Sequence, residues 1–347
     1  MTKSNPGHFF EDFKVGMKLV HATPLTVSEG DISLYRALTG SRHALYSSAV
    51  FAAANGFSEL PIDPLLVFHV VFGKSVPDIS LNAVANLGYG DGRFIEGVYP
   101  GDTLNSVSDV IGVKENSNGK TGVVWVRTTG FNQHGRPVLS YVRWVMVNKR
   151  DASNPAPEPV VPDLPAAVPA EQLSGDFTYD DWDKDLSGSP WFYEDYAVGE
   201  KIDHVDGMTI EEAEHQIATR LYQNTAKVHF DAHAQKDSRF GKRLIYGGVV
   251  ISLARAISFN GLGNAAQMIA INAGTHCNPV FSGDTVYAWS EVIDKARLSD
   301  RTGALRLRIV ATKNTPCGDF PLRGEDGKYD PDVLLDFDYW AAIPMKG

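Results

Sequence analysis

The feature that most constrains the fold of this chain is an internal duplication. The stretch FEDFKVGMKLVHATPLTVSE at residues 10–29 aligns with YEDYAVGEKIDHVDGMTIEE at residues 193–212, at an offset of 183 residues and with eight of twenty positions identical. Chance would give roughly one or two identities in such a stretch. The offset shifts to 182 where VYPGDTL at 98–104 meets VFSGDTV at 280–286. The chain is therefore expected to contain two copies of one structural unit.

A segment of different composition separates the two copies. Residues 151–173 are rich in Pro and Ala and contain no aromatic residue, which is typical of an extended linker. We therefore assign residues 1–150 to an N-terminal repeat, residues 151–190 to a linker and residues 191–347 to a C-terminal repeat. The chain has 347 residues, 43% of them hydrophobic, which is enough for two domains of ordinary size.

Each copy shows the same order of patterns. In each copy the duplicated stretch at 10–29 or 193–212, here called the shared opening, leads into a helical stretch, at 29–38 and 211–222. Apolar runs at 63–73 and 247–259 come next. Alternating, β-rich runs follow at 121–131, 137–147, 284–293, 304–313 and 333–343. One helix followed by several antiparallel strands predicts an α+β fold in which the sheet wraps the helix, and the two units would pair their sheets as a pseudo-dimer. The GYGDGRF stretch at 88–94 lacks the Lys-Ser/Thr ending of a phosphate-binding loop and is predicted to be a turn between strands.

Charge and cysteine content exclude several classes of function. The net charge of −10 and the pI near 5.5 argue against a nucleic-acid groove, because phosphate binding requires a concentrated basic patch. The two cysteines, Cys277 and Cys317, have neither metal-ligand spacing nor the pattern of a disulfide framework, which favours a reducing compartment. The polar N-terminus lacks a signal-peptide core, and no run of about 18 apolar residues is present to span a bilayer. A cytoplasmic protein with no membrane segment is expected.

The C-terminal repeat carries a segment that resembles a known family. Residues 221–256, LYQNTAKVHFDAHAQKDSRFGKRLIYGGVVISLARA, are similar to the signature region of the MaoC-like, R-specific enoyl-CoA hydratases. This resemblance implies a double hot-dog fold, in which an antiparallel sheet wraps a central helix in each repeat. It also implies that His229 takes the place of the catalytic histidine and Asp231 that of a later aspartate. Asn224 stands five residues before His229, where the family usually has an aspartate.

Within the family, the sequence QNTAKVHFD and the long N-terminal copy resemble those of the mesaconyl-CoA hydratases, also called β-methylmalyl-CoA dehydratases. The resemblance implies a hydro-lyase that hydrates and dehydrates a branched C5 dicarboxylic acyl-CoA reversibly, as part of carbon metabolism. It implies no metal and no organic cofactor, and an acyl-CoA thioester as the binding partner.

The chemistry of hydration explains the need for these residue types. Adding water to a C=C conjugated with a thioester requires a base for the water, an acid for the α-carbon and donors for the enolate-like oxygen. His229 suits the first task because histidine titrates near neutrality. Asn224 cannot accept a proton, so we expect His229 to make both transfers while Asn224 orients the water. The alternative is a carboxylate elsewhere, such as Asp231 or Glu212.

Other residues near His229 are candidates for substrate binding. The Tyr246-Gly247-Gly248 step resembles the family's His-Gly step, and free N–H groups at this helix start would hold the thioester oxygen. The alternative is that the glycines only permit tight packing. Basic side chains would contact the CoA phosphates or a free acyl carboxylate, or else form a solvated face; those selected for binding are Lys227, Arg239 and Arg243.

The N-terminal repeat has Ser41 and Tyr46 where the C-terminal repeat has Asn224 and His229. It is therefore expected to be non-catalytic and to serve the fold and the shape of the acyl pocket. His21 and His204 recur at matching positions of the shared opening and are expected to be structural.

Three function classes remain open at this point: a hydratase, a hot-dog thioesterase and a non-catalytic acyl-binding module. A metal cluster around His229, Asp231 and His233 is disfavoured because no third-ligand pattern supports it. Sheets of this kind tend to pair, so a homo-oligomer is an alternative to a single chain.

Overall fold

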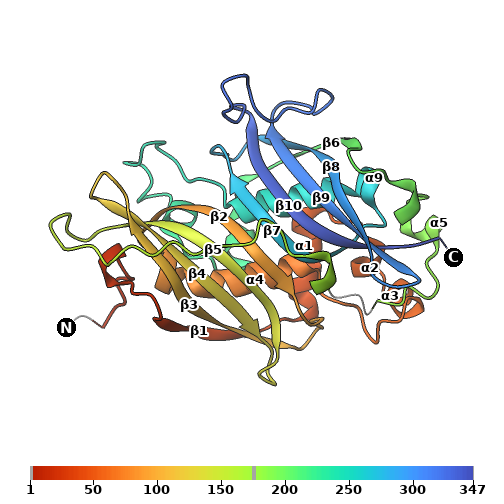
Figure 1. The fold of residues 1–347 in the computed structure, drawn as a ribbon, viewed down its shortest axis with the longest axis horizontal. Coiled ribbons are helices and arrows are strands. Elements are labelled where there is room, and N and C mark those ends of the chain that lie inside the picture. Colours follow the sequence, from red (N-terminus) through yellow and green to blue (C-terminus); the bar gives the residue numbers. More distant parts are fainter. Residues whose placement is uncertain (1–2, 174–176, 347) are drawn as a thin grey trace.

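The fold is organised around one ten-stranded sheet with two buried helices against it (Figure 1). It comes from a computed structural model that describes residues 3–173 and 177–346. All neighbouring strands are antiparallel. In sheet order the strands are β1 (Lys18–Thr26), β3 (Thr103–Glu115), β4 (Thr121–Phe131), β5 (Pro137–Asn148), β2 (Ala83–Phe94), β7 (Gln267–His276), β10 (Val333–Pro344), β9 (Thr302–Lys313), β8 (Thr285–Arg297) and β6 (Lys201–Thr209).

The duplication is visible in the strand order. From one edge the sheet runs β1-β3-β4-β5-β2, and from the other edge β6-β8-β9-β10-β7 follows the same scheme. The two halves join where β2 pairs with β7, for example through Tyr89 and Gly274. This arrangement confirms the predicted α+β class with paired sheets. The β-rich run predicted at 121–131 coincides with β4.

Helices cover one face of the sheet and connect its strands. They are α1 (Glu29–Thr39), α2 (Ala44–Ser47), α3 (Ala49–Ala54), α4 (Pro64–Ser75), α5 (Lys184–Ser187), α6 (Glu212–Leu221), α7 (Lys227–Phe230), α8 (Gly247–Ile257) and α9 (Phe259–Leu262). Short helical turns are η1 (Phe10–Asp12), η3 (Ala170–Gln172) and η4 (Tyr193–Asp195), and the π-helical η2 (Val76–Ser80) continues α4.

The central helices are α4 and α8. Every residue of α4 is buried, as are ten of the eleven in α8, because each helix packs against the sheet and the two helices contact each other. A helix that is apolar on all sides is stable only when it is enclosed in this way. The two helices meet where His69 Nε2 lies 2.8 Å from Ser252 Oγ, and these positions are related by the offset of 183. The repeats therefore face each other about a pseudo-twofold axis through the two helices.

The chain between the repeats crosses the opposite face of the sheet (Figure 1). Val160 forms a bridge with Val113 of β3, and Trp340 of β10 donates its indole N–H to the Val168 carbonyl at 3.0 Å. Tyr339, the neighbour of Trp340, contacts Arg255 of α8. Adjacent strand residues point to opposite faces, so the linker lies on the face away from the helices.

One sequence prediction about the sheet is wrong. Residues 88–94 are not a turn but the second half of β2. Their glycines permit close contacts: a Cβ on Gly88 would lie 2.3 Å from the Trp144 ring, and one on Gly92 would lie 2.9 Å from Ile271 Cβ. The glycines in this strand therefore serve close approach of neighbours within a bulged sheet.

The paired histidines of the shared opening are buried in equivalent contacts. His21 Nε2 lies 2.7 Å from Ser108 Oγ, and His204 Nε2 lies 2.8 Å from Ser290 Oγ. Both histidines are therefore structural, as predicted. In the part of the chain that the structure describes, no helix has the length and apolar character needed to cross a membrane.

Candidate active site

A cavity of about 570 Å³ lies at the start of α8, and both repeats contribute to its wall. The C-terminal repeat supplies the segment from Asn224 to His229, the start of α8 and the end of β7. The N-terminal repeat supplies the end of α4, part of β2 and two residues of β5. Its polar and aromatic lining includes Phe72, Asn86, Tyr89, Arg143, Asn224, His229, Tyr246 and His276.

His229 lies on the one-turn helix α7 and is held in a defined orientation. Its Nδ1 is 3.0 Å from the Leu244 carbonyl oxygen. A carbonyl only accepts, so Nδ1 carries the hydrogen and Nε2 keeps a free lone pair. Burial lowers the pKa of His229 to about 4, and the hydrogen bond to Leu244 opposes this shift. The ring is therefore neutral near pH 7 and able to accept a proton.

Asn224 lies on the irregular segment between α6 and α7 and is 1% exposed. Its Oδ1 accepts a hydrogen bond from the Ala226 N–H at 3.2 Å, and its own N–H donates to Thr219 O. The amide is thereby anchored by its oxygen, which leaves the Nδ2 group as the donor available to the cavity. An asparagine held in this way can orient a water but cannot take a proton from it.

The start of α8 forms a further part of the wall. Gly247 lines the cavity, and a Cβ there would lie 2.3 Å from the His276 ring. A Cβ on Gly248 would meet the rings of Tyr246 and His69, so the packing explanation applies to both glycines. The first N–H groups of a helix have no intrahelical partner. The Tyr246 N–H donates to His215 Nε2 at 3.0 Å, whereas Gly247 presents its backbone to the cavity.

Two functional candidates in this cavity were not predicted from the sequence. His276, at the end of β7, has a pKa lowered to about 4, mainly by burial and also by His229. Its Nε2 lies 3.1 Å from the hydroxyl of Tyr89, which comes from β2 of the other repeat. No spacing in the sequence relates Tyr89 to His276, since the contact exists only because β2 and β7 pair.

Comparison with known proteins agrees with this geometry. Residues 1–163 match the family described as mesaconyl-CoA hydratase, and residues 194–314 match the MaoC like domain. The chain is 59% identical to the β-methylmalyl-CoA dehydratase of Chloroflexus aurantiacus and 61% identical to the mesaconyl-CoA hydratase of Cereibacter sphaeroides, with 99% of each chain covered. The chain belongs to the mesaconyl-CoA hydratase family.

Solved structures support the same assignment. A MaoC domain protein dehydratase from Chloroflexus aurantiacus superimposes with a TM-score of 0.98 at 58% identity, over 100% of both chains. A Mycobacterium tuberculosis protein described as a double hotdog fold matches with a TM-score of 0.78 at 24% identity, covering 98% of this chain and 99% of its own. The double hot-dog fold predicted from the resemblance is confirmed.

The structure places four of the predicted site residues outside the cavity of this mesaconyl-CoA hydratase family member: Gly248, at which a Cβ would meet Tyr246 and His69, and three charged residues. Asp231 is exposed, and its Oδ1 accepts a hydrogen bond from the Ala234 N–H. Lys227 is exposed at the start of α7. Arg243 is bound to Glu212 and Gln216 of α6, so it fastens the loop to that helix.

These positions have a common physical reason. The segment around His229 lies near the surface, so its charged side chains, Lys227 before His229 and Asp231 and Arg243 after it, reach solvent or surface partners. The geometry does not support catalysis by Asp231 or by Glu212, whose carboxylate is occupied by Arg243. Arg239 is exposed and lines the mouth of the cavity, where it remains a candidate for binding the CoA part of a ligand. In residues 3–173 and 177–346, no group of three or more His, Cys, Asp or Glu is placed to hold a metal ion.

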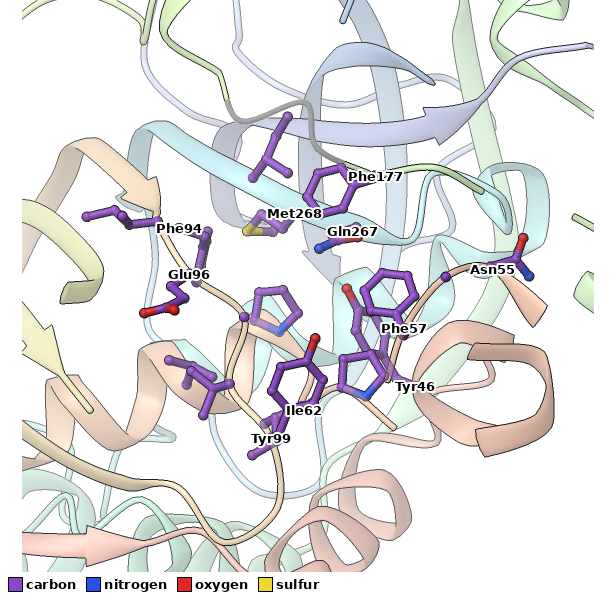
Figure 2. Close-up of a pocket in the computed structure, with 18 of the residues that line it drawn as sticks. Tyr46, Asn55, Phe57, Ile62, Phe94, Glu96, Tyr99, Phe177, Gln267 and Met268 are labelled. Carbon is purple, nitrogen blue, oxygen red and sulfur yellow. The ribbon is translucent and has the colours of Figure 1, made fainter. Parts of the chain in front are cut away.

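A second cavity, of about 320 Å³, occupies the equivalent place in the N-terminal repeat (Figure 2). Tyr46, which corresponds to His229, lines it, and Gln267 and Met268 of β7 face it from the other repeat. Within the described part of the chain, the Tyr46 hydroxyl is buried without a hydrogen-bond partner. Ser41, which corresponds to Asn224, is not part of its wall. Among the described residues no histidine lines this cavity, and its carboxylate, Glu96, is paired with Arg136 at 3.0 Å.

Proposed function

We propose that this chain catalyses the reversible addition of water to mesaconyl-CoA, giving β-methylmalyl-CoA. The single observation that carries the proposal is the neutral, oriented His229 in a cavity of a chain about 60% identical to two enzymes bearing those names. Identity at this level over 99% of each chain supports a shared substrate in addition to a shared fold.

In the proposed mechanism His229 makes both proton transfers. Nε2 takes a proton from water as the water oxygen bonds to the β-carbon, and the C=C electrons move towards the thioester oxygen. The same nitrogen then delivers that proton to the α-carbon, and the carbonyl re-forms. Dehydration is the reverse: His229 removes the α-proton and returns it to the leaving hydroxyl. General acid–base catalysis of this kind is typically worth about 10²- to 10⁴-fold.

Two further groups assist in this proposal. The Nδ2 group of Asn224 donates a hydrogen bond to the attacking water and holds it on one side of the double bond. The Gly247 N–H, at the positive end of the α8 dipole, stabilises the negative charge that develops on the thioester oxygen. His276 and the Tyr89 hydroxyl border the same space and limit where the acyl group can lie.

The test is hydration of mesaconyl-CoA by the purified protein, with crotonyl-CoA in parallel. Loss of enoyl-thioester absorbance without release of free thiol is expected for mesaconyl-CoA and is expected to disappear in His229→Ala. Reaction with crotonyl-CoA alone would support hydratase activity but would contradict mesaconyl-CoA as the substrate. Release of free CoA would show that the protein is a thioesterase, and binding without turnover would show an acyl-binding module.

The proposal also includes the cellular compartment and the oligomeric state. Cys277 and Cys317 are free thiols, which supports a reducing, cytoplasmic compartment. Association into a homo-oligomer stays a prediction, and light scattering of the purified protein would measure it.

A further inference from the structure

Arg143 is a buried cation in the wall of the 570 Å³ cavity. It projects from β5 with 0% exposure. Its Nη1 donates to Ser80 Oγ at 2.8 Å and its Nη2 donates to Ser75 Oγ at 2.9 Å. Its guanidinium carbon lies 4.4 Å from the centroid of the Phe72 ring. Two hydroxyls and an aromatic face thus fix the guanidinium, and none of them carries a negative charge.

No carboxylate in the described part of the chain compensates this charge. Arg143 takes part in none of the ion pairs formed by residues 3–173 and 177–346. Its Nε is buried and has no hydrogen-bond partner among these residues. Burial lowers the pKa of Arg143, yet a guanidinium stays protonated at neutral pH. A buried charge without a partner is costly, which is the expected state of a site whose anion arrives with a ligand.

A second polar side chain in the same wall is also unsatisfied. Asn86 of β2 lines the cavity, and both its Oδ1 and its Nδ2 are buried with no partner among the described residues. β2 and β5 are neighbours in the sheet, with Asn86 opposite Val145 and Tyr89 opposite Arg143. The unsatisfied donors of Asn86 and Arg143 therefore come from one strand pair of the N-terminal repeat.

The C-terminal repeat provides an internal comparison. By the offset of 183, Arg255 of α8 corresponds to Phe72 of α4, and it lies over Tyr339 at 5.3 Å from the ring centroid. Tyr339 is the seventh residue of β10, as Arg143 is of the equivalent strand β5, so the arginine and the aromatic residue have exchanged helix and strand. Both Nη atoms of Arg255 have acceptors, namely Ser258 Oγ, Ala265 O and Ala266 O at 2.9, 3.0 and 2.9 Å. It does not line the 320 Å³ cavity. Arg255 serves the fold, whereas Arg143 has donors left over and faces the larger cavity.

A continuous aromatic wall joins Arg143 to the candidate base. The Phe72 ring under the guanidinium packs on Tyr246, with centroids 5.5 Å apart, and Tyr246 packs on His229 at 5.6 Å. We infer that Arg143, assisted by Asn86, binds the free carboxylate of a dicarboxylic acyl thioester while His229 acts on its double bond. The inference rests on the proposed function for the reaction, and adds that the N-terminal repeat selects the acyl group.

The first test uses two saturated thioesters of equal length that cannot be hydrated. Succinyl-CoA ends in a carboxylate where butyryl-CoA ends in a methyl group. The wild-type protein is expected to bind succinyl-CoA on the order of 100-fold more tightly, because truncating a buried charge contact has an effect of this size. Equal affinities would overturn the inference. A preference for succinyl-CoA in a protein that does not hydrate mesaconyl-CoA would reject the proposed function and leave the carboxylate subsite standing.

The second test removes the charge. Arg143→Met is expected to reduce the preference for succinyl-CoA to less than about 3-fold and to leave butyryl-CoA binding nearly unchanged, because only the carboxylate contact is lost. Arg255→Met is the matched control, since it removes an equally buried arginine and should preserve the preference. Thermal unfolding identifies a misfolded variant, and Arg143→Lys, which keeps the charge, should then retain part of the preference. An Arg143→Met protein that is folded and still prefers succinyl-CoA contradicts the inference.

Discussion

The cavity at the start of α8 and the cavity at the start of α4 occupy equivalent places in two copies of one unit, yet they differ in chemistry. The first has a volume of about 570 Å³ and contains His229, while the second has about 320 Å³ and contains Tyr46. Both copies keep the paired histidines of the opening segment in buried hydrogen bonds to serine. The duplicated scaffold is therefore retained in both halves, but among the described residues histidines line the larger cavity and none lines the smaller one, whose carboxylate is that of Glu96.

The difference also shows that the two halves are not independent. Tyr89, Arg143 and Asn86 belong to the N-terminal repeat but line the cavity of the C-terminal one. In the same way, Gln267 and Met268 of β7 line the cavity of the N-terminal repeat. Each cavity is thus built across the pseudo-twofold axis, and a repeat without a base of its own still completes the site of its partner.

The largest expected effect is that of removing the base. His229→Ala should lower kcat/KM for mesaconyl-CoA by about 10³-fold or more, because it removes the proposed base, and Nε2 of the other histidine in the cavity, His276, is already engaged with the Tyr89 hydroxyl. Tyr46→Phe, at the equivalent position, should leave kcat/KM within about 2-fold. Initial-rate assays at saturating and limiting substrate measure both variants. Comparable losses in the two variants would mean that both cavities contribute to catalysis and that their chemistry does not differ as inferred.

Asn224→Ala should have a smaller effect, a fall in kcat of about 10- to 100-fold, because misplacing a reacting group by about 1 Å has consequences of this size. KM should change little, since the amide is assigned to the water and not to the thioester. The control is Ser41→Ala at the equivalent position, which should leave kcat unchanged. An Asn224→Ala enzyme with full kcat would remove Asn224 from the mechanism.

The pH profile tests the environment of His229. Burial holds its pKa at about 4, below the usual histidine value of 6.5, and only the neutral ring accepts a proton. Activity should therefore be flat between about pH 5.5 and 8 and fall as pH drops through about 4, tenfold per unit below it. Circular dichroism at each pH separates titration from acid unfolding. A midpoint near 6.5 would show that His229 is solvated in the working enzyme.

Much of the fold could be predicted from the sequence, because its signals are local. The offset of 183 identifies the repeats, and the alternating residues at 121–131 predict β4. The sequence around His229 indicates the site. The prediction for 88–94 failed because three glycines in seven residues are typical of turns. In this strand they accommodate neighbours such as the Trp144 ring, which lie far away in sequence.

The rest of the site could not be predicted because it depends on contacts between the repeats. Nothing in the spacing relates Arg143 or Tyr89 to His229, and their proximity follows from the pairing of β2 with β7. Asp231 is predicted from the family resemblance, and Arg243 from its closeness to His229 in sequence. The outward turn after α7 carries Asp231 to the surface and Arg243 to the Glu212 carboxylate.

The smallest expected effect is that of placing a histidine in the other cavity. Tyr46→His in an otherwise His229→Ala protein should restore no measurable hydration, because a base alone does not complete the site. Gly247 corresponds to Pro64, which begins α4 and has no N–H to offer a thioester oxygen. No equivalent of Arg143 faces the smaller cavity, since Tyr339 takes that position and Arg255 is engaged with backbone carbonyls. The prediction is tested by following mesaconyl-CoA absorbance with Tyr46→His, with His229→Ala and with the double variant. Hydration activity above that of His229→Ala would show that the N-terminal repeat lacks only the base. The start of α8 and Arg143 would then contribute less to catalysis than the geometry of the two cavities implies.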